Sequence, residues 1–203
     1  MTKRRLTNRS NAKSQRTLTG CFSTILIVLV LCAGVFLVCS NQEEFTKLQY
    51  PLDYYEYVEK YSEEYDVPKS LIFAVIRSES SFDSTALSYA GAHGLMQITS
   101  ETFDWLQYRR DATGDYVTSD LYIPEVNIDY GTYFLSYLLD KYESETTAIA
   151  AYNAGVGAVD GWLQDKDISN DGVTLDNIPY PETANYVKKV ISAKEVYSGL
   201  CAE

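Results

Sequence analysis

The sequence predicts a mainly α-helical domain that is preceded by one transmembrane helix. Near the N-terminus, an unbroken apolar segment is long enough to cross a bilayer. Farther along the chain, apolar residues recur every three or four positions in several separate stretches, which is the period of an amphipathic helix. At most a small β element is expected, around the glycine-rich residues 91–98.

The predicted transmembrane helix covers residues 21–40. Residues 1–20 contain six lysines and arginines and no acid, and no charged residue occurs from position 17 to position 42. About 20 apolar residues in a helix span the ~30 Å hydrocarbon core, and the basic flank of such a helix stays in the cytoplasm. We therefore expect a single-pass protein of the cell membrane, with residues 41–49 as a tether and residues 50–203 as an outer, extracytoplasmic domain.

A cleaved N-terminal signal is the alternative to this anchor. The apolar run exceeds the ~7–15 residues usual for a signal peptide, and no Ala-x-Ala site follows it. A lipoprotein site at Cys39 fits poorly because Val38 precedes the cysteine. Only Cys201 lies in the outer domain, so no disulfide within that domain is expected.

Charge and residue inventory exclude several classes of function. The chain has 17 Lys and Arg against 28 Asp and Glu, and without the six bases of the N-terminal tail the remainder carries a formal charge of −17. Nucleic acid is therefore not an expected partner. His93 is the only histidine and is expected to be a loop residue. A Ser-His-Asp triad, a metal site and a phosphate-binding loop are not indicated, and no cofactor is predicted.

The first two helices of the outer domain are expected at residues 54–65 and 68–80. The first has aromatic or apolar side chains at positions 54, 57, 58, 61 and 65, a helical spacing that favours a face packed on the core over a carbohydrate-stacking surface. The second begins after Pro68 and is apolar almost all round, which is typical of a buried helix. Its Glu79 would thus be partly desolvated, and desolvation raises the pKa of a carboxyl group.

Further helices and loops follow in order. A helix from Ser100, with Ser100 as its N-cap, would point Phe103 and Leu106 inward. A long periodic run after Pro124 predicts a scaffold helix. Shorter helices are expected at 145–152, 157–163 and 183–197, and loops at 109–119 and 164–178.

Four sequence blocks, in this order, carry a family resemblance. They are Glu79-Ser80-Ser81-Phe82, the Gly-Ala-His-Gly-Leu-Met-Gln-Ile of residues 91–98, the Ala-Tyr-Asn-Ala-Gly of residues 151–155 and the Pro-Glu-Thr-Ala-Asn-Tyr-Val of residues 181–187. Together they resemble the soluble lytic transglycosylase (SLT) catalytic domain family over residues 50–199. The resemblance implies a goose-type lysozyme-like fold and an enzyme that cleaves bacterial peptidoglycan. Asn127 and Gly131 also fit the family's sequence pattern.

The resemblance implies a reaction carried by one glutamate. Glu79 matches the residue that protonates the oxygen between N-acetylmuramic acid and N-acetylglucosamine and then accepts the proton of the C6 hydroxyl, so that a 1,6-anhydro sugar forms. The implied partner is the peptidoglycan glycan strand. The implied substrate-binding residues are Ser88, Met96, Gln97, Tyr152, Asn153, Glu182 and Tyr186.

Several alternatives remain at the level of sequence. Glu182 could instead stabilise a helix N-terminus, and Tyr186 could be a core residue. Thr99 and Ser100 depart from the Met and Pro that the family often has, which affects a wall of the cleft and a turn. A goose-type muramidase would use water positioned by Asp83 or Glu182. A catalytically silent wall-binding scaffold is the other alternative, and the presence of Glu79 argues against it.

Overall fold

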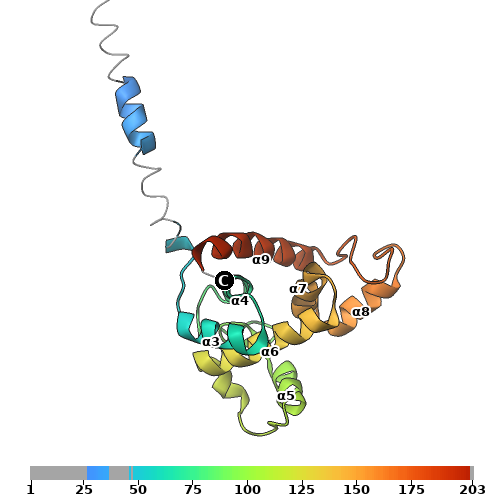
Figure 1. The fold of residues 1–203 in the computed structure, drawn as a ribbon. Coiled ribbons are helices and arrows are strands. Elements are labelled where there is room, and N and C mark those ends of the chain that lie inside the picture. Colours follow the sequence, from blue (N-terminus) through green and yellow to red (C-terminus); the bar gives the residue numbers. More distant parts are fainter. Residues whose placement is uncertain (1–26, 37–45, 47, 202–203) are drawn as a thin grey trace, which may run out of the picture. The chain divides into compact units, whose positions relative to one another are not determined.

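The computed structural model describes residues 27–36, 46 and 48–201 (Figure 1), and the chain divides into two units, Met1–Pro51 and Leu52–Glu203. In the first unit, residues 27–36 are helical and expose apolar side chains such as Leu29 and Phe36. Within the described ranges, no helix is both long enough and apolar enough to cross a membrane. The rest of the predicted span, the basic tail and most of the tether lie outside the described residues.

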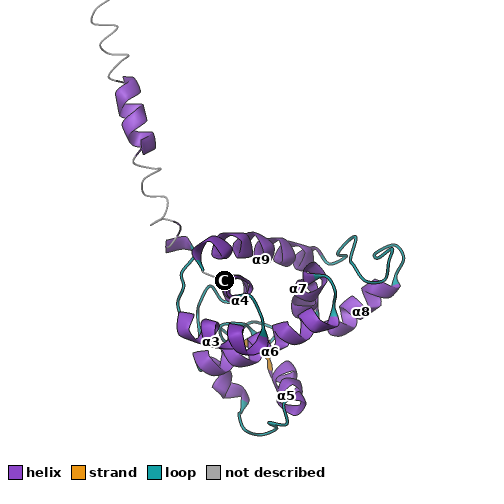
Figure 2. Ribbon diagram, in the orientation of Figure 1, coloured by secondary structure: helices purple, strands orange, loops and turns teal. Residues whose placement is uncertain are grey.

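The second unit is almost entirely helical, as predicted (Figure 2). A small antiparallel β element joins β1 (Ala92–His93) to β2 (Ile98–Thr99), within the segment where one was expected. The helices are α3 (Tyr55–Tyr65), α4 (Lys69–Glu79), α5 (Ser100–Arg109), the 3₁₀ helix η1 (Thr118–Tyr122), α6 (Pro124–Lys141), α7 (Glu145–Ala154), α8 (Val156–Gln164) and α9 (Pro181–Leu200).

Helix α4 forms the centre of this unit. All six side chains from Leu71 to Ile76 are completely buried, which confirms the prediction from its apolar sequence. It packs most extensively on α9, and on its other side it contacts α3 (Figure 1). Burying a large aliphatic side chain contributes about 1.5–3 kcal/mol, so this helix is a main source of the domain's stability.

The start of α5 differs by one residue from the prediction. The N-cap is Thr99, whose hydroxyl accepts a hydrogen bond from the backbone N–H of Thr102 at 3.2 Å, whereas Ser100 is already helical. Thr99 ends β2 in an extended conformation, which leaves its hydroxyl free to turn back over the first helical turn. Phe103 and Leu106 are fully buried, as expected.

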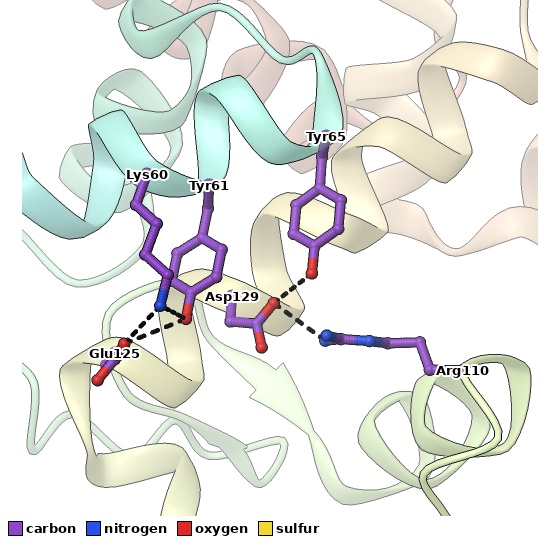
Figure 3. A network of polar contacts seen from close by, with 6 residues as sticks. All are labelled: Lys60, Tyr61, Tyr65, Arg110, Glu125 and Asp129. Carbon is purple, nitrogen blue, oxygen red and sulfur yellow. Dashed lines mark hydrogen bonds and ion pairs between the residues drawn. The ribbon is translucent and has the colours of Figure 1, made fainter.

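The aromatic face of α3 packs on α6 and is held there by ionic groups (Figure 3). The Tyr65 hydroxyl donates to the Asp129 carboxylate at 2.6 Å, and the Arg110 guanidinium donates to the same oxygen at 3.0 Å. Nearer the start of α6, the Lys60 ammonium lies 2.8 Å from the Glu125 carboxylate. The prediction that this face is a packing surface is confirmed, and Arg110 also fixes the end of α5 against α6.

Asn127 on α6 fastens the loop that joins β1 to β2. Its side-chain oxygen accepts from the backbone N–H of Met96 at 2.7 Å, and its amide nitrogen donates to the carbonyls of His93 at 2.9 Å and Leu121 at 2.8 Å. One turn farther along α6, a Cβ on Gly131 would lie only 2.4 Å from the Met96 sulfur. Both residues therefore let the loop lie directly on α6.

Replacing Asn127 by alanine is expected to lower the free energy of unfolding by about 2–4 kcal/mol. The substitution leaves one buried N–H and two buried carbonyls without their partner, and each unsatisfied group costs roughly 1–3 kcal/mol before relaxation. Urea unfolding of the two chains gives the difference. Asp140→Ala, at an exposed position of the same helix, is the control. An equally small loss in both variants would contradict the role assigned to Asn127.

Candidate active site

Glu79 is the last residue of α4, and its carboxyl group has an unusual environment. Burial raises the pKa of this carboxyl from 4.5 to about 7, although the Tyr186 hydroxyl and the Lys189 ammonium favour the charged form. The C-terminal end of a helix also disfavours a negative charge. At neutral pH a substantial fraction of Glu79 is therefore protonated, as the apolar sequence of its helix predicted.

Ser80 connects the end of α4 to the loop between the strands. Its hydroxyl lies 2.8 Å from the Leu95 carbonyl and 3.2 Å from the Ile76 carbonyl. A hydroxyl has one proton to donate, so these two acceptors share it. The serine that follows the glutamate thus holds the carboxyl-bearing helix end against the loop.

A cavity of about 300 Å³ opens beside Glu79. Six of the eight predicted site residues line it, namely Glu79, Ser88, Gln97, Tyr152, Asn153 and Glu182. They come from four separate parts of the sequence: the end of α4, the loop around β1 and β2, the end of α7 and the start of α9. The fold therefore brings all four sequence blocks together at one cavity.

Ser88 and Gln97 line the cavity and also shape the loop that forms its wall. The Ser88 hydroxyl accepts from the backbone N–H of Ala92 at 2.9 Å. The Gln97 amide donates to the carbonyls of Gly94 at 2.9 Å and Ala86 at 3.2 Å. Gln97 itself has a φ of 50°, so its side chain stabilises a backbone turn that is unfavourable for most residues.

The structure does not bring the Met96 side chain to the cavity surface. That side chain is fully buried against α6 and is not part of the cavity lining, unlike the apolar wall residue that was predicted. The Met96 carbonyl instead accepts a hydrogen bond from the Tyr152 hydroxyl at 2.8 Å. Burial, and after it the nearby Glu79 charge, raise the pKa of Tyr152 well above its ordinary value. Tyr152 is thus near Glu79, but its hydrogen bond holds the loop.

The opposite wall comes from α7 and α9. The Asn153 side-chain oxygen accepts from the Thr183 hydroxyl at 2.9 Å, which joins the two helices. Glu182 lines the cavity at the exposed start of α9. One turn later, the Tyr186 hydroxyl is buried beside Glu79 and favours the charged form of that carboxyl. Tyr186 is therefore behind the cavity lining.

Lys189 also lies near the carboxyl, and sequence reasoning did not identify it. Its ammonium donates to the Ser78 carbonyl at 2.8 Å, at the C-terminal end of α4, and it lowers the pKa of Glu79. It lies on α9, two residues after the end of the final motif. Only the packing of α9 on α4 reveals this proximity.

Sequence reasoning also missed most of the uncharged lining. Besides Thr99, whose place in the wall was anticipated, the cavity is lined by Ala90, Ala92, Ile98, Thr102 and Phe134. By contrast, Asp83 is exposed, caps the backbone of Thr85 and is not in the lining. His93 is outside the lining too, and it lies in strand β1 rather than in a loop as expected, with its Nδ1 2.9 Å from the Tyr122 hydroxyl.

This arrangement can donate a proton to a bound molecule. A carboxyl with a pKa of about 7 is effective as a general acid near neutral pH, because it is both populated and acidic enough to transfer its proton. The cavity beside it is of the size that binds small ligands or single units of a polymer.

Comparison with known proteins agrees with the site's geometry. Residues 56–172 match the family described as the Transglycosylase SLT domain. The chain is 33% identical over 151 residues to the soluble lytic murein transglycosylase of Escherichia coli K12, covering 73% of this chain and 23% of that protein. It is 34% identical over 165 residues to the membrane-bound lytic murein transglycosylase C of Actinobacillus pleuropneumoniae, covering 71% of this chain and 45% of that protein.

The fold also matches solved structures. One is an inactive glutamate-to-glutamine mutant of the lytic transglycosylase Slt from Pseudomonas aeruginosa, with a TM-score of 0.66 and 31% sequence identity. The match covers 76% of this chain and 25% of that one. This chain thus spans less than half the length of these relatives.

The raised pKa of Glu79 predicts that stability depends on pH. Between pH 4.5 and 7, the folded chain holds a proton on Glu79 that the unfolded chain has released. The free energy of unfolding should therefore fall as the pH rises through this range, by up to about 3 kcal/mol, and stay level above it. Glu79→Gln removes this pH-dependent contribution. The free energy of unfolding of the variant should therefore increase relative to that of the parent chain as the pH rises from 4.5 to 7.

Urea unfolding at pH 5, 6, 7 and 8 measures the difference between the two chains. Glu143→Gln, at an exposed position, serves as a control for the loss of one carboxylate. A difference between Glu79→Gln and the parent that does not change with pH would be incompatible with a raised pKa at Glu79.

Proposed function

The chain belongs to the Transglycosylase SLT domain family, and from this premise we propose that it is a peptidoglycan lytic transglycosylase with Glu79 as its catalytic residue. Its substrate is the glycan strand, cleaved at the β-1,4 bond between N-acetylmuramic acid and N-acetylglucosamine. The observation that carries the proposal is a carboxyl with a pKa of about 7 at the wall of a cavity. The inactive glutamate-to-glutamine mutant of the Pseudomonas relative supports an essential glutamate in this fold.

In the first step, protonated Glu79 gives its proton to the bridging oxygen, and the bond from that oxygen to C1 of the muramic acid breaks. Positive charge develops at C1, and the acetamido oxygen of the same sugar stabilises it. Proton donation of this kind typically accelerates a reaction by ~10²–10⁴-fold. No second carboxylate is required for this step.

In the second step, the Glu79 carboxylate accepts the proton of the C6 hydroxyl while the C6 oxygen bonds to C1. The product is a 1,6-anhydro sugar, and the acid is restored without consuming water. The charged intermediate form of Glu79 is stabilised by the Tyr186 hydroxyl and the Lys189 ammonium, the two groups that lower its pKa. Their modest effect is suited to a group that must be neutral before the first step and charged after it.

The substrate-binding role is assigned to the polar groups of the lining. Ser88, Gln97, Asn153 and Glu182 present hydroxyl, amide and carboxylate groups toward the cavity, and such groups match the hydroxyl and acetamido groups of the sugars. Tyr152 lines the cavity beside them, and its hydrogen bond to the Met96 carbonyl holds the loop in place. No cofactor takes part in this mechanism.

A hydrolytic muramidase is the second candidate, and Glu182 favours it. This carboxylate lines the same cavity as Glu79 and could orient a water molecule toward C1. Asp83, the other carboxylate considered for this role, is not in the lining. The products distinguish the two reactions.

Digestion of purified peptidoglycan is expected to yield anhydromuramoyl products, which are one water lighter than muramidase products by mass spectrometry. Glu79→Gln should reduce the rate by at least ~10²-fold, because the glutamine cannot transfer a proton. Glu143→Gln is the matched control and should retain the parental rate. Products that end mainly in reducing muramic acid would establish the hydrolytic reaction instead.

Anchoring to the cell membrane is the second part of this proposal. The apolar residues 21–40 form a single-pass helix, with the basic tail of residues 1–20 in the cytoplasm and the catalytic domain outside. The exposed apolar side chains of the helix at 27–36 and the relative that is named membrane-bound support this view. Anchoring would keep the enzyme close to the inner surface of the wall.

Protease treatment of intact cells, or of spheroplasts if an outer membrane is present, should remove the catalytic domain and leave a membrane-protected fragment with the N-terminal tail. An epitope at residue 2 and another at the C-terminus would follow the two parts. Recovery of a soluble form that begins near Ser40 would refute the anchor.

A further inference from the structure

Lys189 links helix α9 to the end of the helix that carries the acid. Its ammonium donates to the Ser78 carbonyl at 2.8 Å, and the two residues are 111 positions apart in the chain. The extensive packing of α9 on α4 brings them together (Figure 1). The carbonyl belongs to the last turn of α4, where carbonyls lack an intrahelical N–H donor, so the lysine satisfies one of them.

The same hydrogen bond fixes the position of a positive charge. Lys189 is exposed, and a long exposed side chain ordinarily samples many rotamers. Here the ammonium is held at the residue that precedes Glu79, and the partial negative charge at the C-terminal end of α4 attracts it further. The charge therefore acts on the Glu79 carboxyl from a defined place.

The other titratable groups around Glu79 do not supply a positive charge to it, within the part of the chain that the structure describes. They are Tyr152 on α7, Tyr186 and Glu182 on α9, and Arg77 on α4 itself. Burial raises the pKa of both tyrosines well above its ordinary value, so neither is charged near pH 7. The guanidinium lies two positions before Glu79, and helical residues at that spacing do not face each other.

A cation in this position affects both halves of the proton cycle. The alkaline fall in kcat/KM follows the loss of the proton from the general acid of the free enzyme. A nearby positive charge favours the carboxylate, so it lowers the pH at which that proton is lost. It also makes the protonated group a stronger acid and stabilises the carboxylate that must act as the base in the second step.

We infer that Lys189 is a positioning residue for the reaction: its ammonium, held on the Ser78 carbonyl by the packing of α9 on α4, sets the upper pH limit at which Glu79 acts as the general acid. The inference rests on the proposed function. It extends that proposal because it assigns control of the pH range to a residue outside the four sequence blocks and outside the cavity lining.

The first test compares the full chain in mild detergent with Lys189→Met, which keeps the length of the side chain and removes its charge. Initial rates on soluble glycan strands, far below saturation, give kcat/KM from pH 5.5 to 8.5. The ratio of kcat/KM in the variant to that in the parent should rise roughly twofold or more across this range. Lys188→Met, at the neighbouring exposed position, is the matched control, and Lys189→Arg should restore the parental profile.

The second test does not depend on activity. Carbon-13 NMR follows the titration of the Glu79 carboxyl, whose signal is identified by its absence from Glu79→Gln. The midpoint should lie at higher pH in Lys189→Met than in the parent chain, because the charged form has lost a favourable interaction. It should remain at the parental pH in Lys188→Met and in Lys189→Arg.

The outcomes separate this inference from the proposed function. A ratio of rates that does not change with pH, or an equal change in Lys188→Met, would overturn the role of Lys189. A shifted midpoint in a chain that produces no anhydro sugars would support that role while overturning the proposed reaction. A parental midpoint in a Lys189→Met chain that still produces anhydro sugars would do the reverse.

Discussion

The candidate active site depends on the desolvation of one carboxyl group. Glu79 is the last residue of α4, a helix whose side chains from Leu71 to Ile76 are all completely buried. A carboxylate at such a place would need a close cationic partner to stay charged at low pH. Here the cation, Lys189, is on the exposed side and binds a backbone carbonyl, so burial prevails and the pKa rises to about 7. A direct ion pair between Lys189 and Glu79 would lower this pKa and weaken the acid.

Most of the recognisable motif residues act on the backbone around this carboxyl. Ser80, Gln97, Asn127 and Tyr152 all direct side-chain hydrogen bonds to carbonyl or N–H groups of the loop from residue 93 to residue 97, or to a neighbouring turn. Gly131 contributes by leaving room for Met96. The loop is thereby held by side chains at the end of α4, on α6 and on α7. These hydrogen bonds restrict the movement of the loop relative to Glu79. Pre-organisation of this kind is what proton transfer to a bound substrate requires.

The aromatic and ionic groups of α3, α5 and α6 have a complementary effect. Asp129 receives both Tyr65 and Arg110, and Arg110 lies 4.5 Å above the Tyr130 ring. These contacts hold the end of α5 against α6, as does the Arg109 guanidinium over the Tyr137 ring. Since α5 and α6 carry Thr102 and Phe134, the same contacts determine the shape of this part of the cavity lining.

The sequence by itself determined the helices and the position of the acid, because these depend on local patterns. The period of apolar residues located α3, α4, α6 and α9 to within a few residues, and the apolar character of α4 predicted the raised pKa of Glu79. The sequence could not determine which side chains meet across the fold. Only tertiary packing decided that Thr102, Phe134 and Lys189 lie near the acid, that Met96 is buried behind the wall, and that Thr99 caps α5. Most of these contacts join residues that are far apart in the chain, and the Thr99 cap depends on the conformation of one turn. Neither kind of contact produces a periodic pattern in the sequence.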